Sequence, residues 1–338
     1  MLEPPPLPDA VQQALRALST DVQELNSTFV TELAALPTPL EFMRYVARNR
    51  PFVVRGGAQD WPARTKWTMA YLCERLRDQL VTVAVTPNGY ADAVVDDTYF
   101  VEPYQTRLPF REIVDLFEQR SRRSDQSTPG PASAHLQDYH YYVQSQNGNL
   151  AGDFQVLEAD VLADIPFATA ALETRPDAVN FWMGQASSVT SLHKDPYENI
   201  YVVLAGTKTF TLLAFSLTCL ELRPRADGST VPWVAVDPLD RTSAARARYP
   251  LFYNEARALH VTVASGDLFY LPALWYHHVQ QSDDDAGRVI AVNYWYDLDY
   301  TMPLYPYFRL TQNLRAAVPE SELDCEADPG PVPPRADR

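Results

Sequence analysis

From Tyr139 onwards the chain is a succession of short runs rich in β-branched and aromatic residues, and this pattern restricts its fold more than any other feature. The runs cover residues 141–144, 179–183, 199–204, 207–213, 259–263, 268–270 and 289–296. Runs of this length, with turn residues such as Gly206 and Gly266 between them, are typical of antiparallel strands. They predict a mainly β fold with flanking helices, whose core is a double-stranded β-helix of the jelly-roll or cupin type.

The N-terminal region is predicted to be largely helical. Apolar residues recur at helical spacing in four stretches, residues 10–18, 22–36, 68–77 and 109–119. Thr38 precedes a further helix that runs to Arg48, and Glu41 stands in the position of a capping box. Two short strands are predicted in the same region, residues 51–55 and 80–86.

These patterns divide the chain into five segments. They are an N-terminal helical segment (1–37), a region of helices and strands that packs on the core (38–138), the jelly-roll core (139–300), a C-terminal helix (301–318) and an acidic, Pro-rich tail (319–338). Residues 121–137 are rich in Ser, Pro and Arg and predict a mobile surface loop. The C-terminal helix closes the fold, and we keep a homodimer interface open as its role.

The overall charge restricts the partners of the chain. A net charge of −15 argues against nucleic acid, because phosphate binding needs a basic surface. No apolar run approaches the ~20 residues that span a bilayer, so we expect no membrane insertion. Cys73, Cys219 and Cys325 show neither a disulfide framework nor a zinc spacing, which fits a reducing compartment. We therefore expect a cytoplasmic protein, with the nucleus left open as a second location.

Two histidine motifs lie beside the β runs. His193-Lys194-Asp195 stands between two of them, and His277-His278 follows the run LFYLPALWY. Residues i and i+2 of an extended segment point to the same side, so His193 and Asp195 are able to reach one metal ion. Two histidines and one carboxylate occupy one face of an octahedral ferrous ion and leave the other face for 2-oxoglutarate and O₂. An H-x-D pair alone is common and usually structural, so this interpretation depends on the residues around it.

A candidate site for 2-oxoglutarate accompanies the metal motif. Lys208, one of only three lysines in the chain, follows His193 on the next β run but one. A buried ammonium on a barrel strand is suited to pair with the distal carboxylate of 2-oxoglutarate. Thr190 offers a hydroxyl to the same carboxylate, and Asn199 and Asn293 offer side-chain amides.

Several of these segments together resemble a known family. VTSLHKDPYENIYVVLAGTKTFTLL, GDLFYLPALWYHHVQQS and AVNYWYD look like the JmjC (cupin-like) oxygenases, as does FMRYVARNRPFVVRGGAQDWPARTKWT upstream. VAVTPNGYADAV and PDAVNFWMGQASSVTSLHKD are closer still to a lysyl hydroxylase within that family. The resemblance covers roughly residues 38–315 and implies a jelly-roll fold that uses Fe(II), 2-oxoglutarate and O₂.

The resemblance also implies roles for individual residues. His193, Asp195 and His277 match the iron ligands, whereas His278 matches a neighbour that does not bind the metal. The matches to positions around the cosubstrate are Lys208, Thr190, Tyr142, Asn199 and Asn293. Tyr142 is equally well read as a core aromatic residue when the sequence is taken alone.

Three functions are open at this point. The first is lysyl C-hydroxylation of a protein, for which the resemblance implies GTPases of the developmentally regulated GTP-binding class as partners. The second is N-methyl-lysine demethylation, although related demethylases often have Glu where Asp195 stands. The third is a peptidase or a non-catalytic cupin that serves as a binding module. Asp92 is a candidate for binding a substrate ammonium, and an exposed turn carboxylate is its alternative reading.

Overall fold

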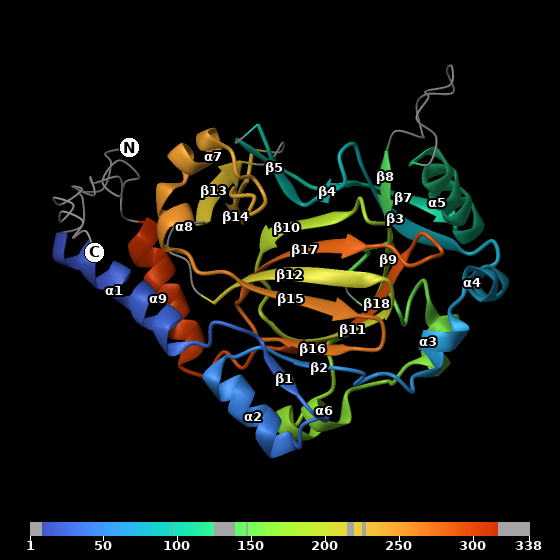
Figure 1. Ribbon diagram of the computed structural model, residues 1–338, viewed down its shortest axis with the longest axis horizontal. Helices are drawn as coiled ribbons and strands as arrows, with labels where there is room; N and C mark the ends of the chain where they lie inside the picture. The colour runs from blue at the N-terminus through green and yellow to red at the C-terminus, as the bar shows by residue number, and fades with distance from the viewer. Residues whose placement is uncertain are drawn as a thin grey trace, which may run out of the picture.

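The computed structural model describes residues 9–96, 98–124, 139–146, 148–214, 220–224 and 228–316, and two facing β-sheets lie at its centre (Figure 1). The first sheet has the order β1 (Thr31–Leu33), β2 (Phe52–Val54), β16 (Leu268–Leu271), β11 (Tyr197–Ala205), β18 (Val289–Asp297) and β9 (Ala178–Gly184). The second has the order β15 (Leu259–Ala264), β12 (Thr207–Leu213), β17 (Tyr276–Ser282), β10 (Val189–His193) and β4 (Tyr90–Ala91). The predicted mainly β jelly roll with flanking helices is confirmed.

The six-stranded sheet is buried on both faces. Successive side chains of a strand point to opposite faces, and along β11 Tyr201 and Val203 face the second sheet while Ile200 and Val202 pack into a separate core cluster. Phe210 of β12 meets Tyr201 at 5.3 Å between ring centroids, which joins the two sheets. The runs that predicted these strands are therefore almost continuously apolar, as two-sided burial requires.

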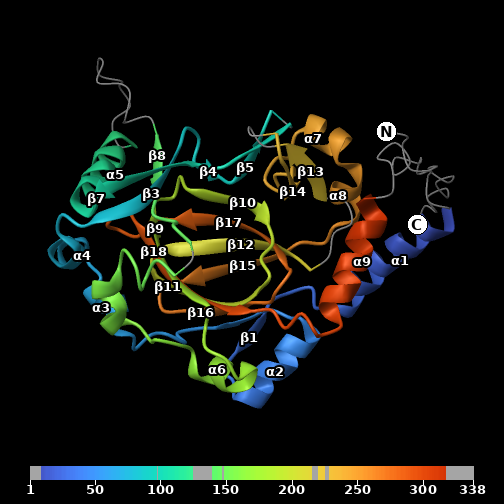
Figure 2. The same ribbon diagram turned by 180° about the vertical axis from the view of Figure 1, so that it is seen from behind.

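Helices cover the outer face of the six-stranded sheet (Figure 2). They are α2 (Pro39–Arg48), α3 (Pro62–Lys66), α4 (Met69–Leu76) and α6 (Pro166–Leu172), with the 3₁₀ helix η1 (Gln155–Asp160). Phe42 of α2 packs against Phe167 of α6 and Tyr270 of β16, with centroid separations of 5.2 and 4.9 Å. The capping box predicted from Thr38 and Glu41 is present and begins α2.

Asp160 connects this helical layer to its neighbours. The side chain is 4% exposed, and its carboxylate accepts hydrogen bonds from Lys66 Nζ at 2.8 Å, Trp67 Nε1 at 3.1 Å and the Tyr71 hydroxyl at 2.6 Å. A buried carboxylate needs such donors because it has lost its water. The end of η1 is thereby fixed to α3 and α4.

One predicted helix is wrong over most of its length. Residues 22–36 were expected to be helical, but α1 (Asp9–Leu25) ends early and Thr31–Leu33 forms β1, which pairs in parallel with β2. Asn26 and Ser27 explain the end of the helix, because the Asn26 amide donates to the Val22 carbonyl and the Ser27 hydroxyl accepts from Phe29 N. Such local side-chain bonds compete with continued helix formation.

A third group of elements lies along the edge of the five-stranded sheet that β10 and β4 form (Figure 1). It contains a small sheet with the order β7 (Tyr104–Pro109), β3 (Leu80–Thr86), β8 (His140–Tyr142), the helix α5 (Phe110–Ser124), and the hairpins β5 (Ala93–Val95)–β6 (Tyr99–Val101) and β13 (Leu220–Pro224)–β14 (Thr230–Val234). Two short helices follow, α7 (Ser243–Arg248) and α8 (Pro250–Glu255). Residues 121–124, which were predicted to be part of a loop, belong to α5, and the rest of that predicted loop lies outside the described residues.

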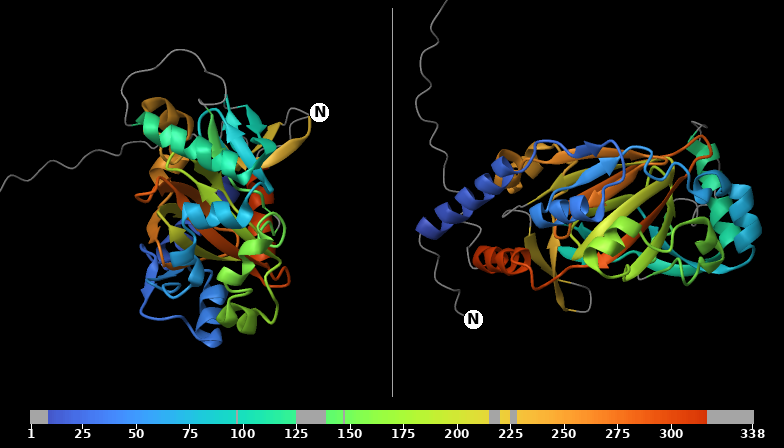
Figure 3. Two further views of the ribbon diagram at one scale, coloured as in Figure 1. Left: turned by 90° about the vertical axis from the view of Figure 1, so that its right-hand side faces the viewer. Right: turned by 90° about the horizontal axis from the view of Figure 1, so that it is seen from below.

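The last helix, α9 (Leu304–Ala316), lies at the same end of the molecule as α1 (Figure 3). It lies within the predicted segment 301–318, while its role in a homodimer stays a prediction. The acidic tail 319–338 lies outside the described residues. Among the described residues, no helix has both the length and the apolar character that crossing a bilayer requires.

Candidate metal centre

His193, Asp195 and His277 come together at one point between the two sheets. One ligand atom from each side chain lies within 4.8 Å of the others. The carboxylate Oδ2 of Asp195 is 3.5 Å from His193 Nε2 and 3.6 Å from His277 Nε2. His193 and His277 are direct partners across the antiparallel pair β10–β17, which explains why a separation of 84 residues leaves their rings 4.1 Å apart.

The backbone fixes the orientation of both imidazole rings. His193 Nδ1 lies 2.8 Å from the Ser191 carbonyl, and His277 Nδ1 lies 3.0 Å from the Trp275 carbonyl. A ring that donates through Nδ1 to a carbonyl presents an unprotonated Nε2 to a metal ion. Asp195 follows the end of β10, and its own carbonyl accepts a hydrogen bond from Leu274 N, which holds the connection in place.

The protonation states suit metal binding. Burial opposes the ionisation of Asp195, but the charge of His193 and a hydrogen bond from it outweigh this effect and hold the pKa of Asp195 at about 2. Burial, together with the charge of His193, lowers the pKa of His277 to about 4. The ionised Asp195 and the neutral His277 are the forms that bind a metal ion at neutral pH. Burial opposes the charged form of His193, but Asp195 outweighs this effect and raises the pKa of the ring, so His193 releases its proton when a metal ion binds. Two imidazoles and one carboxylate are also the donor set of non-haem Fe(II) centres, so these residues fit a ferrous ion.

His278 is separated from the three ligands although it adjoins His277. Neighbouring side chains on a strand point to opposite faces, and His278 faces away from the metal centre toward Asp237, 4.0 Å from its Oδ1. It is 1% exposed, and neither ring nitrogen has a hydrogen-bond partner. The structure thus brings His277, and not His278, to the other two ligands.

Lys208, Tyr142 and Thr190 form one hydrogen-bonded group in the same pocket. The ammonium of Lys208 donates to the Tyr142 hydroxyl at 2.9 Å, and that hydroxyl is hydrogen-bonded in turn to Thr190. These three residues and the three metal ligands line a common cavity of about 240 Å³. Burial lowers the pKa of Lys208 to about 7, because no described carboxylate offsets the loss of water. A buried cation of this kind is a receptor for an anionic group.

Two residues beside Lys208 were not singled out from the sequence. Gln281 is the register partner of Lys208 across β12 and β17, and its Oε1 accepts from the ammonium at 2.7 Å. Gly184 lies against the same group, where an added Cβ would be 2.7 Å from the ring of Tyr142 and 2.8 Å from Gln281 Nε2. Both assignments depend on strand register, which the sequence pattern did not specify.

Asn199 and Asn293 lie on adjacent strands of the other sheet and meet inside the cavity. The Asn293 amide donates to Asn199 Oδ1 at 3.1 Å, and Asn293 Oδ1 accepts from Asn180 and from Trp182 Nε1. Both asparagines are almost fully buried. They form a polar wall of the cavity across from the five-stranded sheet.

The remaining wall carries aromatic and acidic side chains. The Trp233 ring stacks on His193 with an interplanar angle of 8° and a separation of 5.8 Å, and Phe100 packs on Trp233 at 4.6 Å. Asp92 and Glu102 also line this cavity. Asp92 has a left-handed φ of 51°, and its carbonyl accepts a hydrogen bond from the Ser191 hydroxyl. Of the two readings of Asp92, its place in the cavity favours the substrate-binding one.

Several proteins are similar to this chain along most of its length. The family model of the cupin-like domain matches residues 37–302. The human bifunctional peptidase and (3S)-lysyl hydroxylase JMJD7 is 40% identical in an alignment of 330 residues that covers 91% of this chain and 97% of that protein. Lysine-specific demethylase JMJ32 of Arabidopsis thaliana is 34% identical in an alignment of 322 residues that covers 87% of this chain and 89% of that protein. JmjC domain-containing protein E of Dictyostelium discoideum is 33% identical in an alignment of 313 residues that covers 81% of this chain and 85% of that protein.

Proposed function

Because the chain belongs to the cupin-like JmjC family of 2-oxoglutarate-dependent oxygenases, we propose that it hydroxylates a carbon atom of a lysine side chain in a protein substrate. The observation that carries this proposal is the composition of one cavity. A group of three metal-ligand side chains, a buried ammonium and two further carboxylates line the same space.

Each part of the cavity has a defined task in this reaction. His193, Asp195 and His277 would hold Fe(II), at which O₂ activation coupled to decarboxylation of 2-oxoglutarate supplies the oxidising power. Lys208, Tyr142 and Thr190 would hold the distal carboxylate of 2-oxoglutarate, and Asn199 with Asn293 would fix its orientation. Trp233 stacks on His193 and Phe100 packs on Trp233, so these two rings would shield that side of the centre.

A lysine substrate is supported by charge and by the named relatives. Asp92 and Glu102 line the cavity that holds the metal ligands, where carboxylates attract an ammonium group. The net charge of −15 also favours the approach of a basic polypeptide. One relative is named a (3S)-lysyl hydroxylase and another a lysine-specific demethylase. A GTPase of the developmentally regulated GTP-binding class is the first protein substrate to test.

Mass spectrometry of a lysine peptide after turnover separates the three activities. The peptide should be derived from such a GTPase and incubated with Fe(II), 2-oxoglutarate and O₂. Hydroxylation adds one oxygen to the unmodified lysine, demethylation removes a methyl group from a trimethyl-lysine version, and a peptidase cuts the backbone. Replacement of the lysine by arginine should suppress the reaction strongly, because the planar guanidinium differs in shape and charge distribution. Faster loss of methyl groups than gain of oxygen would refute the proposal in favour of a demethylase.

A further inference from the structure

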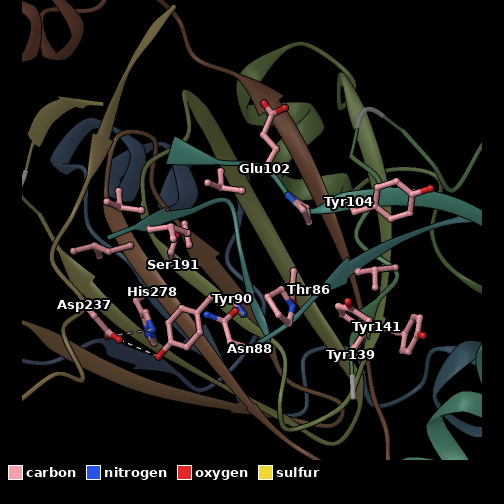
Figure 4. Close-up of a pocket in the computed structure, with 18 of the residues that line it drawn as sticks. Thr86, Asn88, Tyr90, Glu102, Tyr104, Tyr139, Tyr141, Ser191, Asp237 and His278 are labelled. Carbon is pink, nitrogen blue, oxygen red and sulfur yellow. Dashed lines mark hydrogen bonds and ion pairs between the residues drawn. The ribbon is translucent and has the colours of Figure 1, made fainter. Parts of the chain in front are cut away.

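A second and larger cavity, of about 1030 Å³, is lined by residues of some of the strands that also line the metal cavity, and Figure 4 shows its side chains. His277 lines the metal cavity, whereas His278, the next residue of β17, lines the second one. The same division occurs on β8, where Tyr142 faces the metal cavity and Tyr141 the second cavity. The two cavities therefore occupy opposite sides of shared strands, and Glu102, which lines both, marks where they approach each other.

The lining of the second cavity is apolar and acidic. Valines and leucines of β3, β5, β7, α5 and β14 make up much of its wall, and its charged side chains are Glu102, Glu112 and Asp237. Neither a lysine nor an arginine is among the described residues that line it. Such a lining suits a ligand that carries both an apolar group and a positive charge.

One end of the cavity holds a fixed polar cluster. The Tyr90 hydroxyl donates to Asp237 Oδ2 at 2.9 Å, and Leu239 N donates to Asp237 Oδ1 at 2.8 Å. Buried His278, whose two ring nitrogens have no hydrogen-bond partner, faces the same carboxylate at 4.0 Å. In Figure 4 these side chains gather at one end, opposite Tyr139 and Tyr141. The cluster therefore supplies hydrogen-bonding groups to whatever enters.

Apolar side chains extend from the cavity to the surface. Tyr104 is 71% exposed, and Val101, Val95 and Tyr139 are between 40% and 46% exposed. Single exposed apolar residues are ordinary, but a group of them around the mouth of a cavity is typical of an interaction site. The metal cavity, at about 240 Å³, has room for a side chain and the cosubstrate and for little more. Recognition of the polypeptide around a reacting residue thus requires a surface outside it.

We propose that the second cavity binds the stretch of the protein substrate that adjoins the reacting lysine, and that it selects a large apolar side chain next to an arginine or lysine. The proposal rests on the proposed function in assuming a polypeptide substrate. Charge complementarity identifies the occupant, because three carboxylates and an apolar wall match a basic, apolar stretch. Glu102, at the approach of the two cavities, places that stretch next to the reacting side chain.

Labelled peptides test this inference by binding as well as by turnover. The peptides are about fifteen residues long, reach ~50 Å when extended, and carry a central lysine. A Phe-Arg pair is moved from one to six residues away on either side of that lysine, and matched peptides carry Ser-Glu instead. Fluorescence anisotropy should show about tenfold tighter binding for one or two positions of the pair than for its Ser-Glu counterpart.

Variants at exposed positions connect that preference to the cavity. Glu112→Lys inverts a charge of the lining, and Glu118→Lys makes the same change on α5 away from it. Tyr104→Ser removes a rim side chain, and Tyr99→Ser removes an exposed tyrosine that does not line the cavity. Glu112→Lys and Tyr104→Ser should lose the tighter binding of the Phe-Arg peptide over its Ser-Glu counterpart. Glu118→Lys and Tyr99→Ser should keep it. Turnover of Nα-acetyl-lysine methylamide should be the same in all four.

The outcomes separate this inference from the proposed function. Equal binding of the peptides to all four variants, or no dependence on the position of the pair, overturns it. Binding that depends on the cavity without oxygen gain in any peptide leaves the inference standing and refutes the hydroxylase. If Glu112→Lys instead converts a dimer to a monomer in light scattering, the occupant is a second copy of this chain and the inference is wrong.

Discussion

The ammonium of Lys208 lies 2.9 Å from the hydroxyl of Tyr142, and the other oxygen within hydrogen-bond distance in the described structure belongs to the Gln281 amide. Both partners are neutral, so they orient the ammonium without neutralising it. A fully buried cation with neutral partners is costly unless a ligand supplies the negative charge. Among the described residues the ammonium of Lys208 thus lacks a negatively charged hydrogen-bond partner, and an anionic ligand would supply the counter-charge.

Loss of this cation should weaken cosubstrate binding selectively. In Lys208→Ala the 2-oxoglutarate carboxylate would enter a desolvated pocket without its cationic partner, at a cost of ~3–5 kcal/mol. This cost corresponds to a Kd that is about two to four orders of magnitude higher. Lys208→Arg should restore binding only in part, because the planar guanidinium needs different space. Calorimetric titration of the Mn(II)-loaded protein without O₂ measures the effect, and Mn(II) affinity should barely change. Exposed Lys66→Ala is the control, and unchanged 2-oxoglutarate binding in Lys208→Ala would refute the assignment.

The same residue predicts how cosubstrate binding depends on pH. Burial lowers the pKa of Lys208 to about 7, so above that pH the amine must take up a proton before it pairs with the carboxylate. The Kd of 2-oxoglutarate should be constant below pH 7 and rise up to about tenfold per pH unit above it. Calorimetry in buffers of different ionisation enthalpy measures the proton uptake. A Kd that does not change between pH 7 and 9 would contradict this prediction.

Folding stability should show the opposite trend with pH. The unfolded lysine keeps a pKa near 10.5, so between pH 7 and 10.5 the unfolded chain binds more protons than the unliganded folded chain. The contribution of Lys208 is therefore least favourable below pH 7 and improves as pH rises through this window. Urea unfolding of the wild type and of Lys208→Met at several pH values isolates it, because other groups cancel in the difference.

Removal of any one metal ligand should abolish 2-oxoglutarate turnover. His193→Ala, Asp195→Ala and His277→Ala each leave two protein ligands, because among the described residues the metal-ligand group consists of these three side chains. His278→Ala is the matched control, since this ring faces the second cavity. It should keep bound iron and measurable turnover. Mass spectrometry of the purified proteins measures their iron content. Equal loss of iron from His277→Ala and His278→Ala would contradict the assignment of His277, and not His278, as a metal ligand.

Asp160 should matter for stability and not for chemistry. Asp160→Ala leaves the buried Trp67 Nε1 without its acceptor and removes the partner of Tyr71, which should cost ~2–4 kcal/mol of unfolding free energy. Asp160→Asn retains an acceptor and should cost less. Lys66→Ala should have a small effect, because that side chain is about half exposed. Urea titration with an unchanged m-value would measure these differences in unfolding free energy. A wild-type midpoint for Asp160→Ala would show that the hydrogen bonds of Asp160 contribute nothing to stability.

The jelly roll was predictable because two-sided burial requires long apolar strands. β12 begins and ends where the run from Thr207 to Leu213 does, and β11 and β18 extend their predicted runs by only a few residues. The metal-ligand triad was predicted from the H-x-D motif together with the family resemblance, which selected His277 and not His278. Gln281 was not predicted, because its contact with Lys208 depends on the register between β12 and β17.

The second cavity was hidden for a related reason. Its walls come from short strands such as β5 and β6, which carry only a few residues each and no clear alternation. Pairing of Ala84 with Tyr142 brings β3 to β8 across more than fifty residues of chain. Asp92 was recognised as a candidate, but only the three-dimensional structure places it in the metal cavity. Local sequence patterns do not contain such long-range placements.

Because His277 and His278 are consecutive on β17, the strand is a partition with a metal ligand on one side and a binding surface on the other. Thermodynamic reciprocity then constrains the enzyme: any factor by which iron loading changes peptide affinity is also the factor by which the peptide changes iron affinity. A peptide that binds more tightly to the iron-loaded enzyme would therefore also raise the affinity for iron and favour retention of the metal during turnover. Iron occupancy at limiting supply thus becomes a property of the enzyme–substrate complex as well as of the free enzyme.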